Sequence, residues 1–140
     1  MGGKRGFTLI ESVAALALVV LIASTALPAV SSLAASLNVA TSARTLAQTL
    51  RETRARAVAE GTPLEVRFDA ATSLWSVRTL DGTVRRSERL PGTVAFTALP
   101  VRARIRFEPT GVAENGTIVL GSAAATRRIV VNQRGRVRLA

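Results

Sequence analysis

The sequence of 140 residues contains no cysteine, histidine or tyrosine, and its only lysine is Lys4. Without cysteine the chain has no disulfide framework, and no thiol indicates its redox compartment. The same absences remove the usual general bases, nucleophiles and soft metal ligands of enzyme sites. The composition therefore predicts a protein that has no catalytic residues and binds no metal ion, cofactor or small-molecule substrate.

Acidic residues are also scarce, nine against nineteen lysines and arginines, which gives a formal net charge of +10. The carboxylates of the carboxy-terminal part are scattered and include Glu65, Asp69, Asp81, Glu108 and Glu114. No phosphate loop, nucleophile elbow or calcium-loop spacing accompanies them. We expect these residues to be solvated charges and turn residues.

A long segment near the amino terminus lacks charge almost completely. It follows a short basic leader, Met1 to Gly6, and from residue 7 to residue 43 its only ionisable side chain is that of Glu11. The uncharged run from Val13 to Val30 is about as long as a helix that crosses a hydrocarbon core. A carboxylate in such a setting is costly, so we expect Glu11 to have a partner and a function.

Three interpretations of this segment compete. The first is a secretory signal peptide cleaved near residues 23–26, where the small residues Ala-Ser-Thr-Ala stand. The second is a plain membrane anchor whose positive end, with Lys4 and Arg5, stays in the cytoplasm. Neither of these explains why Glu11 interrupts the apolar sequence.

The third interpretation is a resemblance: Gly6-Phe7-Thr8-Leu9-Ile10-Glu11 resembles the processing site of type IV prepilins and type II secretion pseudopilins. The resemblance implies that a membrane-embedded prepilin peptidase cleaves between Gly6 and Phe7 and methylates the new amino group of Phe7. It also implies that Glu11 meets the amino terminus of a neighbouring pilin or pseudopilin in an assembled fibre. Such an ion pair would neutralise a costly charge and fix the axial register of the subunits.

A single long helix is predicted from Phe7 to Glu60. Its second half is amphipathic, because apolar residues recur every three or four positions at Val39, Ala43, Leu46, Leu50 and Ala57. Pro28 should kink or loosen the first half, and Gly61-Thr62-Pro63 should end the helix. We divide the chain into a leader (1–6), a transmembrane and assembly half of the helix (7–30), an amphipathic half (31–61) and a β-rich extracytoplasmic domain (62–140).

Short alternating runs follow the helix, at residues 64–68, 74–78, 102–107, 117–120, 127–132 and 136–139. Asp81-Gly82 and Asn115-Gly116 are typical of hairpin turns, while Pro91-Gly92 and Pro109-Thr110-Gly111 indicate loops. The sequence therefore predicts an α+β fold, in which one antiparallel β-sheet domain packs against the amphipathic half of the helix.

Four segments of this region, 50–64, 105–111, 128–132 and 135–138, resemble GspH/FimT-type minor pseudopilins. The lack of cysteine also favours the minor pilin or pseudopilin branch over major pilins with a carboxy-terminal disulfide. The resemblance implies a pilin-like structural subunit of a type II secretion pseudopilus or of a type IV pilus. It would be a single-pass protein of the bacterial inner (cytoplasmic) membrane with its carboxy-terminal domain outside the cytoplasm. The choice between the two machines stays open.

Arginines gather at the carboxy terminus, where no acidic residue follows Asn115. The candidates for contact with nucleic acid are Arg127, Arg128, Arg134, Arg136 and Arg138. In an extended strand the last three would project from one face and meet successive phosphates. Gly135-Arg136-Val137-Arg138 also resembles the Gly-Arg-x-Arg element of minor pilins that bind DNA during natural competence. The alternative function is therefore DNA capture without base-specific readout.

A simpler interpretation of these arginines competes with DNA capture. Arg102, Arg104 and Arg106 form a similar row, alternating with Ala103, Ile105 and Phe107, as on any half-buried strand with a solvated face. Anionic lipid headgroups would also attract the same charges.

Overall fold

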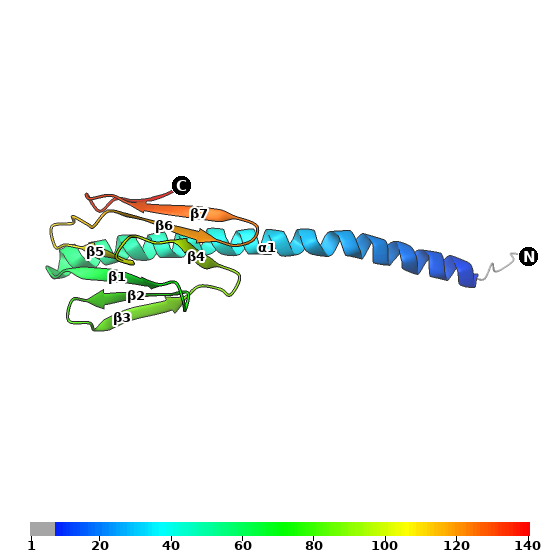
Figure 1. Ribbon diagram of the computed structural model, residues 1–140, viewed down its shortest axis with the longest axis horizontal. Helices are drawn as coiled ribbons and strands as arrows, with labels where there is room; N and C mark the ends of the chain where they lie inside the picture. Colours follow the sequence, from blue (N-terminus) through cyan, green and yellow to red (C-terminus); the bar gives the residue numbers. More distant parts are fainter. Residues whose placement is uncertain (1–7) are drawn as a thin grey trace, which may run out of the picture. The chain divides into compact units, whose positions relative to one another are not determined.

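The computed structural model describes residues 8–140, apart from the side chains of residues 25–27. The chain divides into two compact units, the first ending at Ala34 and the second covering Ala35–Ala140. The elements, shown in Figure 1, are α1 (Leu9–Glu60), β1 (Leu64–Asp69), β2 (Leu74–Thr79), β3 (Val84–Arg89), β4 (Ala95–Ala98), β5 (Arg104–Phe107), β6 (Gly116–Gly121), β7 (Thr126–Val131) and β8 (Val137–Leu139). The predicted order of one long helix and then strands is confirmed.

Helix α1 begins and ends where its flanking residues dictate. The Thr8 hydroxyl accepts a hydrogen bond of 3.4 Å from the Glu11 amide, which places Thr8 at the N-cap. After Glu60 the backbone of Gly61 turns left-handed, with φ of 63°, and Pro63 follows. The predicted end at Glu60 is confirmed, whereas the predicted start at Phe7 lies outside the described residues. The helix continues through Pro28.

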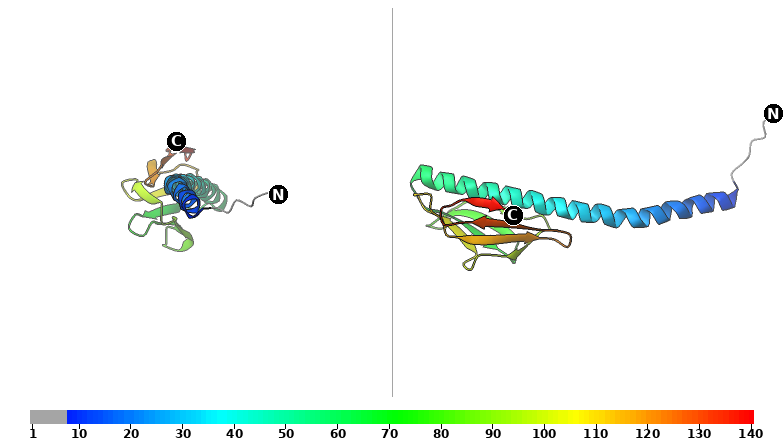
Figure 2. Two further views of the ribbon diagram at one scale, coloured as in Figure 1. Left: turned by 90° about the vertical axis from the view of Figure 1, so that its right-hand side faces the viewer. Right: turned by 90° about the horizontal axis from the view of Figure 1, so that it is seen from above.

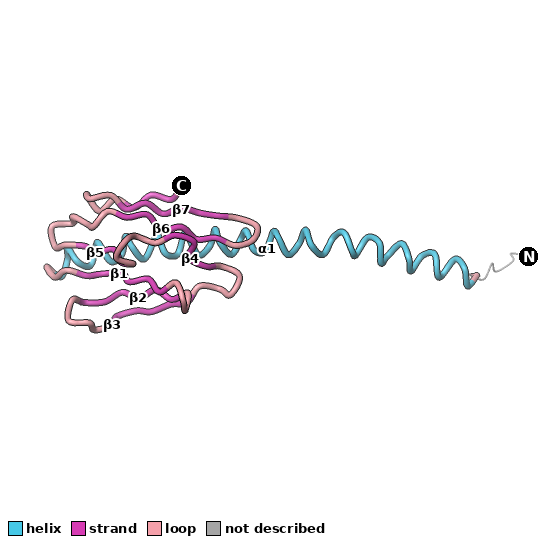
Figure 3. The backbone as a smooth tube through the Cα atoms, in the orientation of Figure 1, coloured by secondary structure: helices cyan, strands magenta, loops and turns pink. Residues whose placement is uncertain are grey.

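The strands of the second unit form two antiparallel sheets of four strands. Their orders are β3-β2-β1-β5 and β4-β6-β7-β8, so the chain passes between the sheets after β3, β4 and β5. Figure 3 shows the short loops that join β2 to β3 and β6 to β7. The first of these holds Asp81-Gly82, and the strands on either side of it pair in antiparallel fashion, so this predicted hairpin is confirmed.

The core lies between the sheets and the carboxy-terminal half of α1. Both sheets lie on the same side of this part of the helix (Figure 2). All five apolar helix positions predicted to pack are buried, and they meet the inward side chains of both sheets. The largest fully buried side chains are those of Trp75, Phe107, Leu46, Leu50, Leu64, Ile105, Ile118, Leu120 and Ile129. Burial of each contributes on the order of 1.5–3 kcal/mol, which binds strands distant in sequence to one helix face.

Several predicted details are wrong. Strands β3 and β4 were not expected, because β3 is a solvated edge strand with four charged residues among six and β4 has only four residues. Asn115-Gly116 is not a hairpin turn, since β5 pairs with β1 and Gly116 opens β6. A side chain at Gly116 would lie 2.6 Å from the Cδ1 of Ile105, so this glycine allows close packing. Arg102 lies before β5, because Ala103 adopts a φ of 48°.

Candidate functional site

Two features remain candidates for function: the apolar half of α1 with Glu11, and the carboxy-terminal arginines. Glu11 lies in the first turn of α1 and its side chain is exposed. Its amide donates to the carbonyl and hydroxyl oxygens of Thr8, and the Ser12 hydroxyl donates to the same carbonyl. These bonds fix the start of the helix before Glu11, while the predicted processing residues Gly6 and Phe7 lie outside the described residues.

The described side chains around and after Glu11 form an exposed apolar surface. The exposed large apolar residues between the start of α1 and Leu37 are Leu9, Ile10, Val13, Leu16, Leu18, Val19, Val20, Leu21, Ile22, Val30 and Leu33. Within the described chain α1 is the one helix whose length and composition suit a membrane span. Exposed apolar area of this extent requires lipid or neighbouring apolar helices.

The five carboxy-terminal arginines are all exposed, but they do not form one continuous strand row. Arg127 and Arg128 lie on β7, Arg138 lies on β8, and Arg134 and Arg136 lie in the turn between these strands. The predicted single row of Arg134, Arg136 and Arg138 is wrong as a strand, because Gly135 turns left-handed with φ of 71°.

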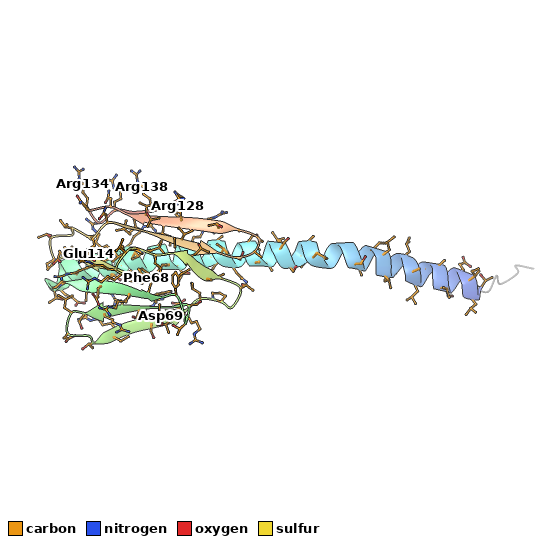
Figure 4. All side chains as sticks on the ribbon, viewed as in Figure 1. Phe68, Asp69, Glu114, Arg128, Arg134 and Arg138 are labelled. Atoms are coloured by element: carbon orange, nitrogen blue, oxygen red, sulfur yellow. The ribbon has the colours of Figure 1, made fainter. Side chains whose placement is uncertain are left out.

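Arg128 on β7 and Arg138 on β8 nevertheless share one face of the second sheet, whereas Arg127 alternates onto the face of Ile129. Arg138 pairs with Val130, and Arg128 bonds through its backbone to Ala140, so both side chains leave the sheet on the side away from Ile129. Figure 4 shows Arg128, Arg134 and Arg138 projecting from the outer side of β7 and β8. We call the five residues Arg127, Arg128, Arg134, Arg136 and Arg138 the terminal arginine group.

Ion pairing distinguishes the row of Arg102, Arg104 and Arg106 from the terminal arginine group, although the two have similar sequence patterns. Arg102 and Arg104 pair with Glu114 at 3.3 and 3.4 Å, Arg104 also pairs with Glu65 at 3.2 Å, and Arg106 pairs with Glu108 at 2.7 Å. In the described residues no carboxylate lies within 4.0 Å of the terminal arginine group. The first row is therefore neutralised within the fold, while the terminal group keeps its charge for solvent or an anionic partner.

Close packing requires the glycine of the Gly-Arg-x-Arg element, Gly135. Gly135 is buried, and a side chain there would overlap the carbonyl oxygen of Gly111 and the Nε of Arg54, with the Cδ of Arg54 at 2.7 Å. Val137, the variable position, is also buried, at 7% exposure. The element therefore alternates packed residues with exposed arginines, and Arg136 and Arg138 point outward because their neighbours point inward.

The scattered carboxylates have structural roles. The prediction of a solvated charge is wrong for Glu65, which is buried at 5% exposure on β1 and pairs with Arg67 and Arg104. The Thr72 hydroxyl holds the pKa of Asp69 below its usual value, and the Thr79 hydroxyl does the same for the pKa of Asp81. Among the described residues no group of three or more acidic residues is placed to hold a metal ion.

Residues 42–135 match the family described as type II transport protein GspH. The chain belongs to the GspH family. The match covers more than half of the sequence and includes most of the second unit. This GspH-family assignment confirms the predicted resemblance. A comparison with curated protein sequences gives no match.

Solved structures show the fold of this GspH-family chain. The minor pseudopilin EpsH from the type 2 secretion system of Vibrio cholerae is similar at a TM-score of 0.62 and 16% identity, covering 74% of this chain and 96% of EpsH. The type IV minor pilin FimU of Pseudomonas aeruginosa is similar at a TM-score of 0.61 and 18% identity, covering 73% of this chain and 87% of FimU. The pilin-like α+β fold is thereby confirmed.

Proposed function

We propose that this protein is a minor pseudopilin or minor pilin, a structural subunit of a type II secretion pseudopilus or a type IV pilus. The observation that carries the proposal is the pairing of a GspH-type packed domain with a bare apolar helix that bears one exposed carboxylate near its start. Among the described residues the core of the second unit begins at Val39, so the apolar part of this helix before it is not needed to complete that core. The helix is instead free to hold the protein in a membrane and then to pack with other subunits.

The proposed maturation begins in the cytoplasmic membrane. A prepilin peptidase cleaves between Gly6 and Phe7 and methylates the amino group of Phe7. Lys4 and Arg5 leave with the leader, which lowers the net side-chain charge to +8. Both lie on the cytoplasmic side, as positive flanks of a membrane helix usually do, so the β-rich domain is extracytoplasmic and the chain crosses the membrane once.

Glu11 then acts in assembly. Its carboxylate pairs with the methylated amino terminus of a neighbouring pilin or pseudopilin, because neither charge is tolerated alone among apolar helices. The exposed position of Glu11 in the first turn of α1 supports this role, since an outward side chain is available to another subunit.

The test compares Glu11→Gln, which removes the charge at almost constant shape, with Ser12→Ala on the same turn. We expect the Glu11 variant to be cleaved and inserted but lost from purified fibres or from complexes with other pilins. The Ser12 variant should assemble as wild type does, and both should unfold at the wild-type denaturant midpoint. Assembly of the Glu11 variant at the wild-type level would overturn this role.

DNA capture by the terminal arginine group is a second candidate function. The observation that favours it is the absence, within the described chain, of carboxylate partners for five exposed arginines, three of which project together from β7, β8 and their turn (Figure 4). Arginine contacts to phosphate fix position without reading sequence, so the expected ligand is duplex DNA of any sequence.

A salt titration of DNA binding tests this function. The variant carries Arg134→Gln, Arg136→Gln and Arg138→Gln, and its control carries the same change at Arg44, Arg56 and Arg89, which are exposed and have no ion pair in the described chain. Both lose three charges. If each terminal arginine meets one phosphate, the slope of log K against log salt falls by about 2–3 in the first variant. Equal binding by the two variants would exclude the terminal arginine group as the DNA site.

A further inference from the structure

The turn between β7 and β8, which bears Arg134 and Arg136, packs against helix α1. The Nε of Arg54 donates a hydrogen bond of 3.0 Å to the carbonyl oxygen of Gly111. The Nη2 of Arg51, one helical turn earlier, donates at 3.3 Å to the carbonyl oxygen of Val137 on β8. Two helix arginines therefore hold backbone atoms of the Gly-Arg-x-Arg element itself, at Val137, and of the loop between β5 and β6, at Gly111.

The guanidinium of Arg54 lies between two left-handed glycines. A side chain at Gly111, where φ is 81°, would lie 3.1 Å from the Nη2 of Arg54, and one at Gly135 would overlap its Nε. Both glycines are buried. The absence of a side chain at both positions lets the two loop backbones close over the guanidinium, and no larger residue permits the same approach.

Further hydrogen bonds connect the loop held by Arg54 to the turn that bears Arg134 and Arg136. The amide of Gly135 donates to the carbonyl oxygen of Asn132 at 2.8 Å, and the amide of Arg136 donates to the side-chain oxygen of Asn132 at 2.9 Å. The carbonyl oxygen of Gln133 accepts from the amide of Ala113 at 2.9 Å. The turn is thus bonded to itself and to the loop that Arg54 holds.

We propose that Arg54 is a positioning residue for the terminal arginine group: it fixes the turn against α1 and so sets the direction of Arg134, Arg136 and Arg138. Within the described chain Arg54 has no carboxylate partner, so its donors are used on loop backbone. A preorganised turn loses less conformational freedom when it binds, which raises affinity without any new contact. This inference rests on the second function proposed above.

The test uses the full-length protein in detergent and compares Arg54→Ala with Arg56→Ala. Arg56 is exposed on the same helix and makes no hydrogen bond or ion pair in the described chain, so both variants lose one charge and only the first loses the contact. The first readout is hydrogen exchange of the Gly135 and Arg136 amides. We expect exchange about fivefold faster in the Arg54 variant, as for the loss of one hydrogen bond, and wild-type exchange in the Arg56 variant.

The second readout is the dissociation constant for a duplex DNA at one fixed salt concentration. We expect binding by the Arg54 variant to be weaker than binding by the Arg56 variant by a similar factor, about fivefold. Unchanged exchange would overturn the contact itself, and faster exchange with equal DNA affinity in the two variants would overturn the positioning role. Faster exchange in a protein that binds no DNA even as wild type would support the contact and refute the DNA function.

Discussion

Replacing Gly135 by alanine should destabilise the domain more than its small size suggests. At φ of 71° an L-residue costs about 1–2 kcal/mol. The new methyl group would also overlap the Gly111 carbonyl oxygen and the Arg54 side chain, and relief of such overpacking costs about 1–3 kcal/mol. We expect a loss of about 3 kcal/mol in the free energy of unfolding. In a domain of this size that corresponds to a fall of more than about 10 °C in melting temperature.

Substitutions at two other glycines measure the backbone strain and the steric overlap separately. At Gly82 φ is 93° and nothing lies within 4 Å of an added side chain, so Gly82→Ala should cost only the backbone strain, about 1–2 kcal/mol. At Gly92 there is neither a left-handed φ nor a neighbour within 4 Å, so Gly92→Ala should change stability by less than about 0.5 kcal/mol.

The assay is urea unfolding followed by fluorescence of the single tryptophan, Trp75, which is 2% exposed and reports loss of the core directly. The order of unfolding midpoints should be Gly92, then Gly82, then Gly135 as the least stable. An equal midpoint for the Gly135 and Gly82 variants would refute the close docking of the terminal turn on Arg54 and Gly111.

Three further substitutions probe other parts of the account. Leu50→Ala, at a helix position with no exposed area, should lower the free energy of unfolding by about 2–5 kcal/mol in the same urea assay. Arg102→Gln should cost less than about 1 kcal/mol, because the Arg102 side chain is 71% exposed and water screens its pair with Glu114. Asp69→Asn should lower the melting temperature at neutral pH and not in strong acid: the pKa of Asp69 is lowered from 3.8, so its contribution exists above that value and disappears as the pH falls through the lowered pKa. A destabilisation by Asp69→Asn that persists in strong acid would contradict this assignment.

Much of the fold follows from local pattern. The helix positions from Val39 to Ala57 recur at helical spacing, and five of the six predicted strand runs correspond to strands of the structure within one residue at each end. Local pattern failed where the determining contact is distant in sequence. Strand β3 is charged and solvated, and its pairing with β2 alone makes it a strand. The apparent hairpin at Asn115-Gly116 failed because β5 pairs with β1 instead of with β6.

In the candidate site, too, local features could be predicted from the sequence and features that depend on distant contacts could not. The leader, the apolar segment and Glu11 are adjacent in sequence, so their pattern could be recognised directly. The burial of Glu65 could not, because its partner Arg104 comes from a strand 39 residues away. Nor could sequence separate the two arginine rows, since the carboxylates that neutralise one of them arrive only through folding. The contact of Arg54 with Gly111 likewise joins residues 57 positions apart.

The central claim is that the chain is a processed pilin-like subunit, and the mature amino terminus tests it most directly. The full-length protein, recovered from the membrane of a cell that contains a prepilin peptidase, would be digested and its first peptide sequenced by mass spectrometry. The account predicts a peptide that begins at Phe7 with a methylated amino group. A peptide that begins at Met1, or one that begins after residue 26, would contradict it and would favour a plain anchor or a signal peptide, respectively.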